Sequence, residues 1–145
     1  MTVLRMDNVS IVVDDLQAAV DFFVELGLSV EGKATVEGEL VDRVVGLDDV
    51  RSDIVMMRTP DGHSRLELTK FHNPAAVADT HNAPANALGI RRIMFAVDDI
   101  DAAVARLQAR GAELFREIVQ YEESYRLCYM RGPEGIIVAL AEPLR

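Results

Sequence analysis

The chain has 145 residues, of which 50% are hydrophobic and 27% are charged, a composition typical of a folded globular domain rather than of a disordered segment. Its 24 acidic and 15 basic residues give a net charge of -9. This charge repels phosphate backbones and anionic lipid surfaces, so neither nucleic acid nor a membrane is expected as a partner. With Cys128 as its single cysteine, the chain has no internal disulfide to form.

The first residues, MTVLRMDNVSIVVDDL, interrupt every apolar run with a charge before a signal peptide or a membrane span could form. Together with the absence of an internal disulfide, this favours a cytoplasmic location. We interpret the acidic excess as a source of solubility. An acidic cleft that concentrates a cationic ligand is the alternative.

The chain repeats itself. A shift of 84 positions lays residues 11–27 (IVVDDLQAAVDFFVELG) over residues 95–111 (FAVDDIDAAVARLQARG). The tripeptide Val-Asp-Asp, the tripeptide Ala-Ala-Val and the final Gly are identical in both stretches. Self-similarity at a fixed shift indicates a duplicated structural unit, so the sequence predicts two copies of one module.

Each copy begins with a run of β-branched or other apolar residues, at residues 9–13 and 93–97, which favours a strand. The Asp pair that follows can accept hydrogen bonds from the free N–H groups at the start of a helix. Apolar residues then recur at helical spacing until Gly27 and Gly111, which suit a left-handed helix stop. Each copy is therefore predicted to start with a strand and an amphipathic helix.

Short apolar segments predict further strands, at LVDRVV (40–45), SDIVMM (52–57), ELFREIV (113–119) and YRLCYM (125–130). Both copies end on a Pro-acid-Gly turn between two strands, within residues 58–68 and 131–140. The stretch 71–88, rich in Ala, Asn and Pro, predicts the connection. A single domain, 1–145, thus divides into module one at about 1–70 and module two at about 89–145.

This order of elements, found twice, resembles the vicinal oxygen chelate superfamily of glyoxalases, bleomycin-resistance proteins and dioxygenases over nearly the whole chain. The resemblance implies an α+β fold in which two tandem βαβββ modules form a curved mixed sheet with a concave cleft. This is the glyoxalase/bleomycin-resistance/dihydroxybiphenyl dioxygenase fold. A small-molecule ligand in the cleft and a homodimer are implied in the same way.

Enzymes of that superfamily hold a divalent metal with His, Glu or sometimes Gln from the first and last strand of each module. The resemblance carries these four positions to Asn8, Glu67, Arg92 and Ala139. Glu67 matches the pattern, whereas Asn is a weak donor, a guanidinium cannot coordinate a cation and Ala has no donor. One carboxylate does not make a metal site, so no metal and no other cofactor is expected.

Two sets of residues near these positions leave alternatives open. Arg92 is predicted to take the electrostatic place of the metal and pair with Glu67, unless each is solvated separately at a sheet edge. We interpret His63, His72 and His81 as exposed residues of the predicted turn and connection, a relocated metal site being the alternative.

Strand alternation predicts which side chains line the cleft, and it turns Leu66 and Leu68 toward the helices instead. The residues predicted to bind a ligand are Asn8, Ser10, Arg65, Glu67, Arg92, Met94, Tyr121, Tyr125 and Tyr129. The tyrosines suit a planar ligand, and Met56, Met57 and Met130 are expected to add adaptable surface, although both residue types also form ordinary core.

These features predict a metal-independent small-molecule binding protein of the bleomycin-resistance type, which would sequester an antibiotic or another natural product. A metal-dependent lyase or isomerase of the glyoxalase, epimerase or dioxygenase-like type is one alternative, and it would require a divalent metal. The other is a metal-free enzyme in which Glu67 acts as the general base, the only catalytic residue the sequence suggests, and Arg92 holds an anionic substrate.

Overall fold

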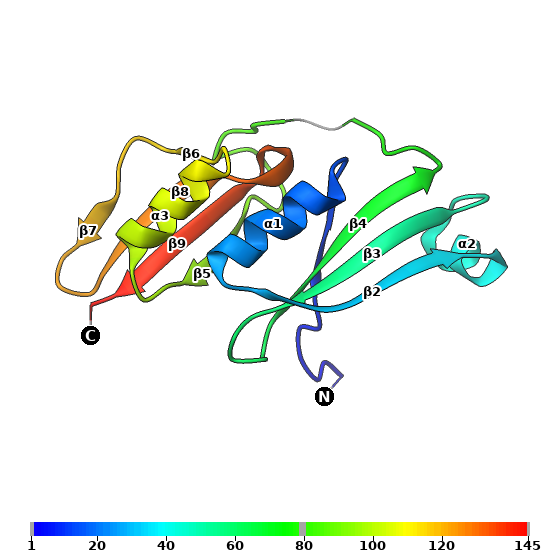
Figure 1. The fold of residues 1–145 in the computed structure, drawn as a ribbon, viewed down its shortest axis with the longest axis horizontal. Coiled ribbons are helices and arrows are strands. Elements are labelled where there is room, and N and C mark those ends of the chain that lie inside the picture. Colours follow the sequence, from blue (N-terminus) through cyan, green and yellow to red (C-terminus); the bar gives the residue numbers. More distant parts are fainter. Residues whose placement is uncertain (1, 79–80, 145) are drawn as a thin grey trace. The chain divides into compact units, whose positions relative to one another are not determined.

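The chain forms two compact units, Met1–Ala78 and Asp79–Arg145, in a computed structural model that describes residues 2–78 and 81–144. Each unit contains one mixed sheet with a helix packed against it (Figure 1). In both sheets the first and last strands of the unit run parallel as neighbours, and the other pairings are antiparallel. The α+β class and the two βαβββ-like modules predicted from the sequence are confirmed.

The first unit follows the predicted order of elements with one addition. Its elements are β1 (Val9–Val12), α1 (Leu16–Leu26), β2 (Ser29–Glu37), α2 (Glu39–Val45), β3 (Arg51–Arg58) and β4 (Arg65–Asn73). The strands lie in the order β1-β4-β3-β2, and α1 packs against β2, β3 and β4. The parallel pair β1 and β4 sets Ser10 beside Glu67.

The second unit repeats this plan with a broken edge strand. Its elements are β5 (Arg92–Ala96), α3 (Ile100–Ala109), β6 (Glu113–Leu114), β7 (Val119–Tyr121), β8 (Tyr125–Arg131), a short 3-10 turn (Pro133–Gly135) and β9 (Ile137–Pro143). Strands β6 and β7 both pair with β8, where the first unit has the nine-residue β2. The chain leaves the sheet between them, at Arg116, whose φ is +44°.

The duplicated Asp pair starts both helices. The side chains of Asp15 and Asp99 accept hydrogen bonds from the backbone N–H groups of Ala18 and Ala102, at 3.0 and 3.1 Å. These bonds satisfy N–H groups that have no partner within the first helical turn. Past the helix ends, Gly27 and Gly111 have φ values of 120° and 92°, which an L side chain rarely adopts.

Alternation along the strands divides each sheet into a face that packs on its helix and an opposite face, called the open face here, on which Ile137 and Ala139 of β9 are nevertheless buried. Leu66 and Leu68 are buried on the helix side, as the sequence predicts. Met57 and Met130 are fully buried, so of the two interpretations of these methionines, ordinary core applies rather than adaptable surface. Met57 pairs with Leu66, and Met130 with Val138, in rows that face the helices.

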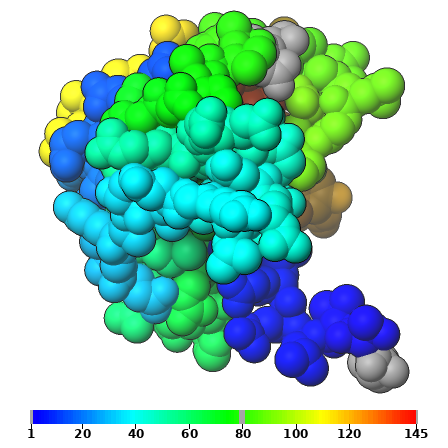
Figure 2. Space-filling model, turned by 90° about the vertical axis from the view of Figure 1, so that its right-hand side faces the viewer, coloured from blue at the N-terminus to red at the C-terminus, as the bar shows by residue number. Residues whose placement is uncertain are grey.

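The segment 40–45, predicted as a strand, is the helix α2. Gly38 and Gly46, with φ values of 111° and 80°, bound it and turn the chain sharply at both ends. The carboxylate of Asp42 accepts hydrogen bonds from the backbone of Asp49 and Val50, at 3.0 and 2.8 Å, which ties the helix to the following loop. The strand preference of the β-branched residues in this segment is therefore outweighed by the flanking glycines and by the hydrogen bonds of Asp42. Figure 2 shows α2 and the loop that follows it facing the viewer, in cyan.

Two further boundaries differ from the sequence prediction. Strand β4 continues to Asn73 and so includes His72, which was expected in the connection. The predicted strand 113–119 holds only the two residues of β6 and the first residue of β7, because residues 115–118 lie outside the ladder. No helix in the described chain is long and apolar enough to cross a membrane.

Gly135, in the turn between β8 and β9, touches the backbone of the connection. Its φ is +74°, and a Cβ there would lie 2.6 Å from Asn82 Oδ1 and 2.8 Å from the Asn82 backbone nitrogen. We expect Gly135→Ala to lower the free energy of unfolding by about 1–2 kcal/mol through φ strain, and by more because Asn82 must move. Urea unfolding of both variants would measure this against Gly111→Ala, where φ is +92° but nothing lies within 4 Å. Equal losses would contradict the predicted clash.

Cys128 is 4% exposed, and burial raises the pKa of its thiol to about 11. At pH 8 only about one thiol in a thousand is then ionised, and the thiolate is the reactive form. We expect Ellman's reagent to leave the folded protein essentially unlabelled while it modifies one thiol per chain in denaturant. Rapid stoichiometric labelling without denaturant would show that the helix-covered face opens readily.

Candidate functional site

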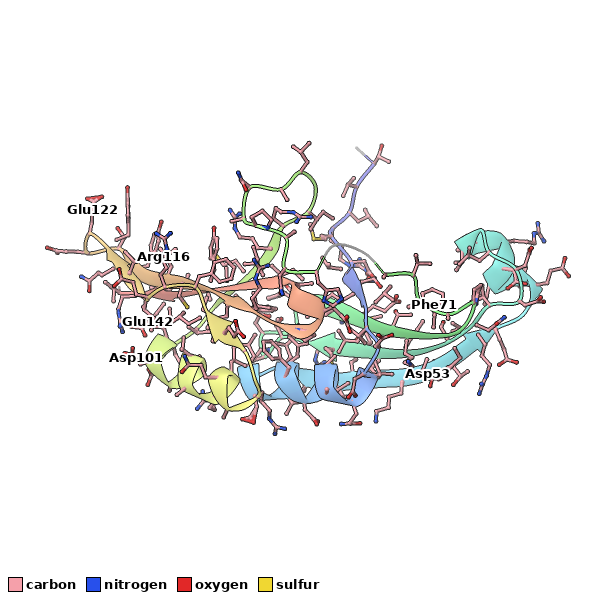
Figure 3. The ribbon with its side chains drawn as sticks, turned by 90° about the horizontal axis from the view of Figure 1, so that it is seen from above. Asp53, Phe71, Asp101, Arg116, Glu122 and Glu142 are labelled. Carbon is pink, nitrogen blue, oxygen red and sulfur yellow. The ribbon has the colours of Figure 1, made fainter. Side chains whose placement is uncertain are left out.

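Glu67 is held on the open face of the first sheet by two hydroxyl groups. Ser10 on β1 and Thr69 on β4 both donate to Glu67 Oε2, at 3.1 and 3.2 Å. Among the other described residues of this unit, none donates a hydrogen bond to Oε1. One carboxylate oxygen is thus held by two hydroxyl groups of the same unit. In Figure 3, Phe71, further along β4, also lies on the side of the sheet away from α1.

Arg65 lies on the same open face of the first sheet as Glu67, and its guanidinium is bound by Glu31 on the edge strand β2. Its Nε and Nη2 donate to the two carboxylate oxygens of Glu31, at 2.7 and 3.1 Å, and Arg58 lies 3.8 Å from the same group. Glu31 occupies the irregularity between Val30 and Gly32 in the β2–β3 pairing. The hydrogen bond from Arg65 is the main cause of a lowered pKa at Glu31. The guanidinium of Arg65 is therefore already paired.

Asn8 lies just before β1, and its side-chain amide donates to Asp7 Oδ2 at 3.1 Å. Its side chain therefore contacts the segment that precedes the sheet rather than a residue of the ladder. The pairing of Arg92 with Glu67 joins residues of different units and stays a prediction.

The open face of the second sheet carries a row of cations and aromatic rings. The Arg92 guanidinium carbon lies 5.2 Å from the centre of the Tyr129 ring. Tyr129 meets Phe115 edge to face at 6.0 Å, and the Arg131 guanidinium carbon lies 4.6 Å from the Phe115 ring. Cations over ring faces are attracted by the negative charge density of the rings. Phe115 was not predicted as a site residue, because its segment was taken for a regular strand.

The strand register arranges these side chains in two rows. Arg92, Ile137 and Arg131 are neighbours across β5, β9 and β8, and the next row is Met94, Ala139 and Tyr129. Met94 is 51% exposed, whereas Ala139 is fully buried beneath this surface.

The three tyrosines fall into two groups on this unit. Tyr121 and Tyr125 stack at 5.7 Å with 22° between their rings, where β7 pairs with β8. Tyr129 follows four residues along β8, about 13 Å away at strand spacing. The prediction of one tyrosine cluster thus resolves into an exposed stacked pair and a separate ring beneath Arg92.

Each histidine has different surroundings. His63 lies in the turn as predicted. His72 Nε2 lies 2.8 Å from Asp53 Oδ2 on the neighbouring strand, and His81 Nε2 lies 3.5 Å from Glu134 Oε1. In the described part of the chain, no three His, Cys, Asp or Glu side chains form a group that could hold a metal ion.

The arrangement of elements and the sequence both point to one family. Residues 5–140 match the family model of the Glyoxalase/Bleomycin resistance protein/Dioxygenase superfamily. The chain belongs to this superfamily. A glyoxalase family protein from Bacillus cereus is similar at 58% identity, with a TM-score of 0.96 over 100% of this chain and 97% of that one. No curated protein matches the chain.

More distant members of known structure share the fold. An antibiotic binding protein from Streptomyces sp. CB03234 is 21% identical, with a TM-score of 0.60 over 99% of this chain and 98% of that one. The trypanothione-dependent glyoxalase I of Leishmania major is 18% identical, with a TM-score of 0.66 over 97% of this chain and 87% of that one. At these identities the likeness shows the fold alone.

The four residues that the resemblance carries to the metal-ligand positions do not have the chemistry to bind a divalent metal. Glu67 has a carboxylate, which is a usual ligand for a divalent metal. Asn8 has a side-chain amide, which is a weak metal ligand, and this amide donates a hydrogen bond to Asp7. In the second unit, Arg92 is a cation over a ring, and Ala139 is a buried methyl group. A positive charge and a methyl group replace two of the donors that a metal would need.

The ion pair between Glu31 and Arg65 should make the free energy of unfolding depend on pH in the acid range. Because the pKa of Glu31 is lowered from 4.5 in the folded protein, the pair stabilises the fold above that value and loses this contribution as the pH falls through the lowered pKa. We expect Arg65→Gln to return the Glu31 pKa toward 4.5, as measured by carboxyl NMR titration. Arg43→Gln on α2 removes the same charge elsewhere and serves as the control. An unchanged Glu31 pKa in Arg65→Gln would contradict the assignment.

Proposed function

We propose that this protein binds a small organic molecule without a metal ion or other cofactor. The observation that carries the proposal is the pair of residues at the second-module ligand positions. Arg92 places a positive charge where relatives coordinate a cation, and Ala139 has no donor atom. A fixed guanidinium repels a divalent ion, so the position favours an organic ligand over a metal.

The open faces offer surfaces suited to such a ligand. On the second unit, Met94 and the ring of Tyr129 supply adaptable and apolar contacts. On the first unit, taken by itself, Glu67 supplies a carboxylate oriented by two hydroxyls. The Streptomyces antibiotic binding protein has the same fold, which supports a role of the bleomycin-resistance type in sequestering an antibiotic or another natural product. A homodimer in the cytoplasm belongs to the same proposal, the first by resemblance and the second by composition.

A metal-free enzyme is the second candidate, and the environment of Glu67 favours it specifically. The two hydroxyls hold Oε2 in place, which would leave Oε1 to accept a proton from a substrate. Such an enzyme would lose turnover but keep substrate affinity in Glu67→Gln, because the amide preserves the shape and removes the base. A binder without catalysis would show no turnover in either form.

The metal-free proposal is tested by elemental analysis of the purified protein, followed by calorimetric titration with Mn, Ni, Zn and Fe(II). We expect no stoichiometric binding, because the donors at the four positions do not form a coordination set. Glu39→Ala, which removes an exposed carboxylate on α2, is the control for Glu67→Ala. One metal per chain that is lost in Glu67→Ala and kept in Glu39→Ala would refute the proposal.

The binding role is tested by a thermal-shift screen of flat aromatic and glycopeptide compounds with the metal-free protein. A ligand at a hundred times its dissociation constant should stabilise the fold by about 2.7 kcal/mol, which raises the melting temperature measurably. A broad panel that produces no shift would count against a binding function.

A further inference from the structure

The arginines of this acidic chain differ in whether a carboxylate neutralises them. In the described part of the chain, ion pairs with acidic side chains are formed by Arg5, Arg51, Arg58, Arg65 and Arg126, among others. Arg92 and Arg131 have no carboxylate oxygen within 4 Å among the described residues of their own unit, 81–144. Even Glu113, which is opposite Arg131 in the β6–β8 ladder, forms no ion pair with it. The open face of the second sheet is therefore locally positive in a chain of net charge -9.

The contacts that these arginines do make leave their charges in place. Arg131 Nη1 donates to the carbonyl oxygens of Ala83 and Gly135, at 2.9 and 3.0 Å. Carbonyl groups satisfy the N–H donors but carry no net charge to cancel the guanidinium. Arg92 lies over the Tyr129 ring, and a planar guanidinium with a ring on one face still directs its N–H groups outward along its edge.

The register places exposed Met94 and the Tyr129 ring beside these charges, with Ile137 and Ala139 buried between the outer strands. Arg92 and Arg131 flank Ile137 in one row, so their backbones are two strand spacings apart, about 10 Å. The adjacent row holds Met94, Ala139 and Tyr129, where the small Ala139 lies between the larger two. A planar body on this second row would bring an attached acidic group to the N–H edge of Arg92.

We propose that this face recognises an aromatic carboxylate, with its acidic group on the Arg92 guanidinium and its ring against Met94 and Tyr129. The inference rests on the proposed binding function and names its ligand class. Two parallel N–H···O bonds between a guanidinium and a carboxylate are strong and directional. Local charge thus favours an anion, although the acidity of the whole chain alone would favour a cation. Pairing of Arg92 with Glu67 would occupy the same guanidinium, so the two predictions exclude each other.

Three probes of one shape and different charge test the proposal by calorimetric titration of the intact protein. They are naphthalene-2-carboxylate, the neutral naphthalene-2-carboxamide and the cationic naphthalen-2-ylmethylammonium. We expect the carboxylate to bind at least tenfold more tightly than the carboxamide, and the ammonium to bind most weakly. Arg92→Gln should weaken the carboxylate about tenfold, or about 1.4 kcal/mol, and leave the carboxamide unchanged.

Matched variants separate the local contact from general charge and from folding. Arg106→Gln removes the same charge from the exposed side of α3 and should change no affinity. Tyr129→Phe keeps the ring and should bind like the original protein, whereas Tyr129→Leu should weaken all three probes. Arg92→Lys keeps the charge but loses the planar fork, and an intermediate carboxylate affinity is expected. Circular dichroism of each variant establishes that it is folded.

Several results would overturn the inference: equal affinity for carboxylate and carboxamide, tighter binding of the ammonium, or an Arg92→Gln protein that keeps carboxylate affinity. The absence of saturable carboxylate binding up to about 5 mM would also do so, since a dissociation constant of about 1 mM corresponds to only about 4 kcal/mol. If the carboxamide or ammonium binds best to the metal-free protein, the charge assignment fails and the binding function stands. A stoichiometric metal lost in Glu67→Ala would refute the binding function instead.

Discussion

The two-residue period of the strands is the constraint on which the rest of the structure depends. Successive side chains point to opposite faces of a sheet, so a helix that covers one face buries alternate residues of the strands beneath it. On β4 this puts Leu66 and Leu68 beneath α1, and Glu67 on the other side beside Ser10. On β5 it leaves Arg92 and Met94 uncovered. The core and the candidate site are therefore alternate residues of the same strands.

The second module shows how a cation at the start of a strand is accommodated on the face of a sheet. The guanidinium of Arg92, at the start of β5, is stabilised by the face of the Tyr129 ring, whose centre lies 5.2 Å from the guanidinium carbon. Tyr129 is in turn positioned by Phe115, and Phe115 by Arg131, which also anchors the backbone at Ala83. A linked set of contacts thus joins β5, β8 and the connection through two rings and two guanidinium groups.

The features that could be predicted from the sequence are those that depend on residues close together in the chain. The capping Asp pairs and the alternation around Leu66 and Glu67 follow from short-range chemistry, and the structure shows them as expected. The helix α2 was missed because the carboxylate of Asp42 binds the backbone seven and eight residues later, which composition does not reveal. Phe115 was missed because an interrupted edge strand has no distinct sequence pattern. For the candidate site, ring and charge contacts such as Arg92 over Tyr129 depend on register between distant strands.

The parallel pairing of β1 with β4, and of β5 with β9, has a consequence for the order in which the chain can fold. Each sheet is completed only when its first strand meets its last, so every module has one long-range loop to close, and closure of such loops slows folding. Both strands of a pair belong to the same unit. On the ribosome, the amino-terminal module can therefore complete its hydrogen-bond network before the carboxy-terminal one has been synthesised.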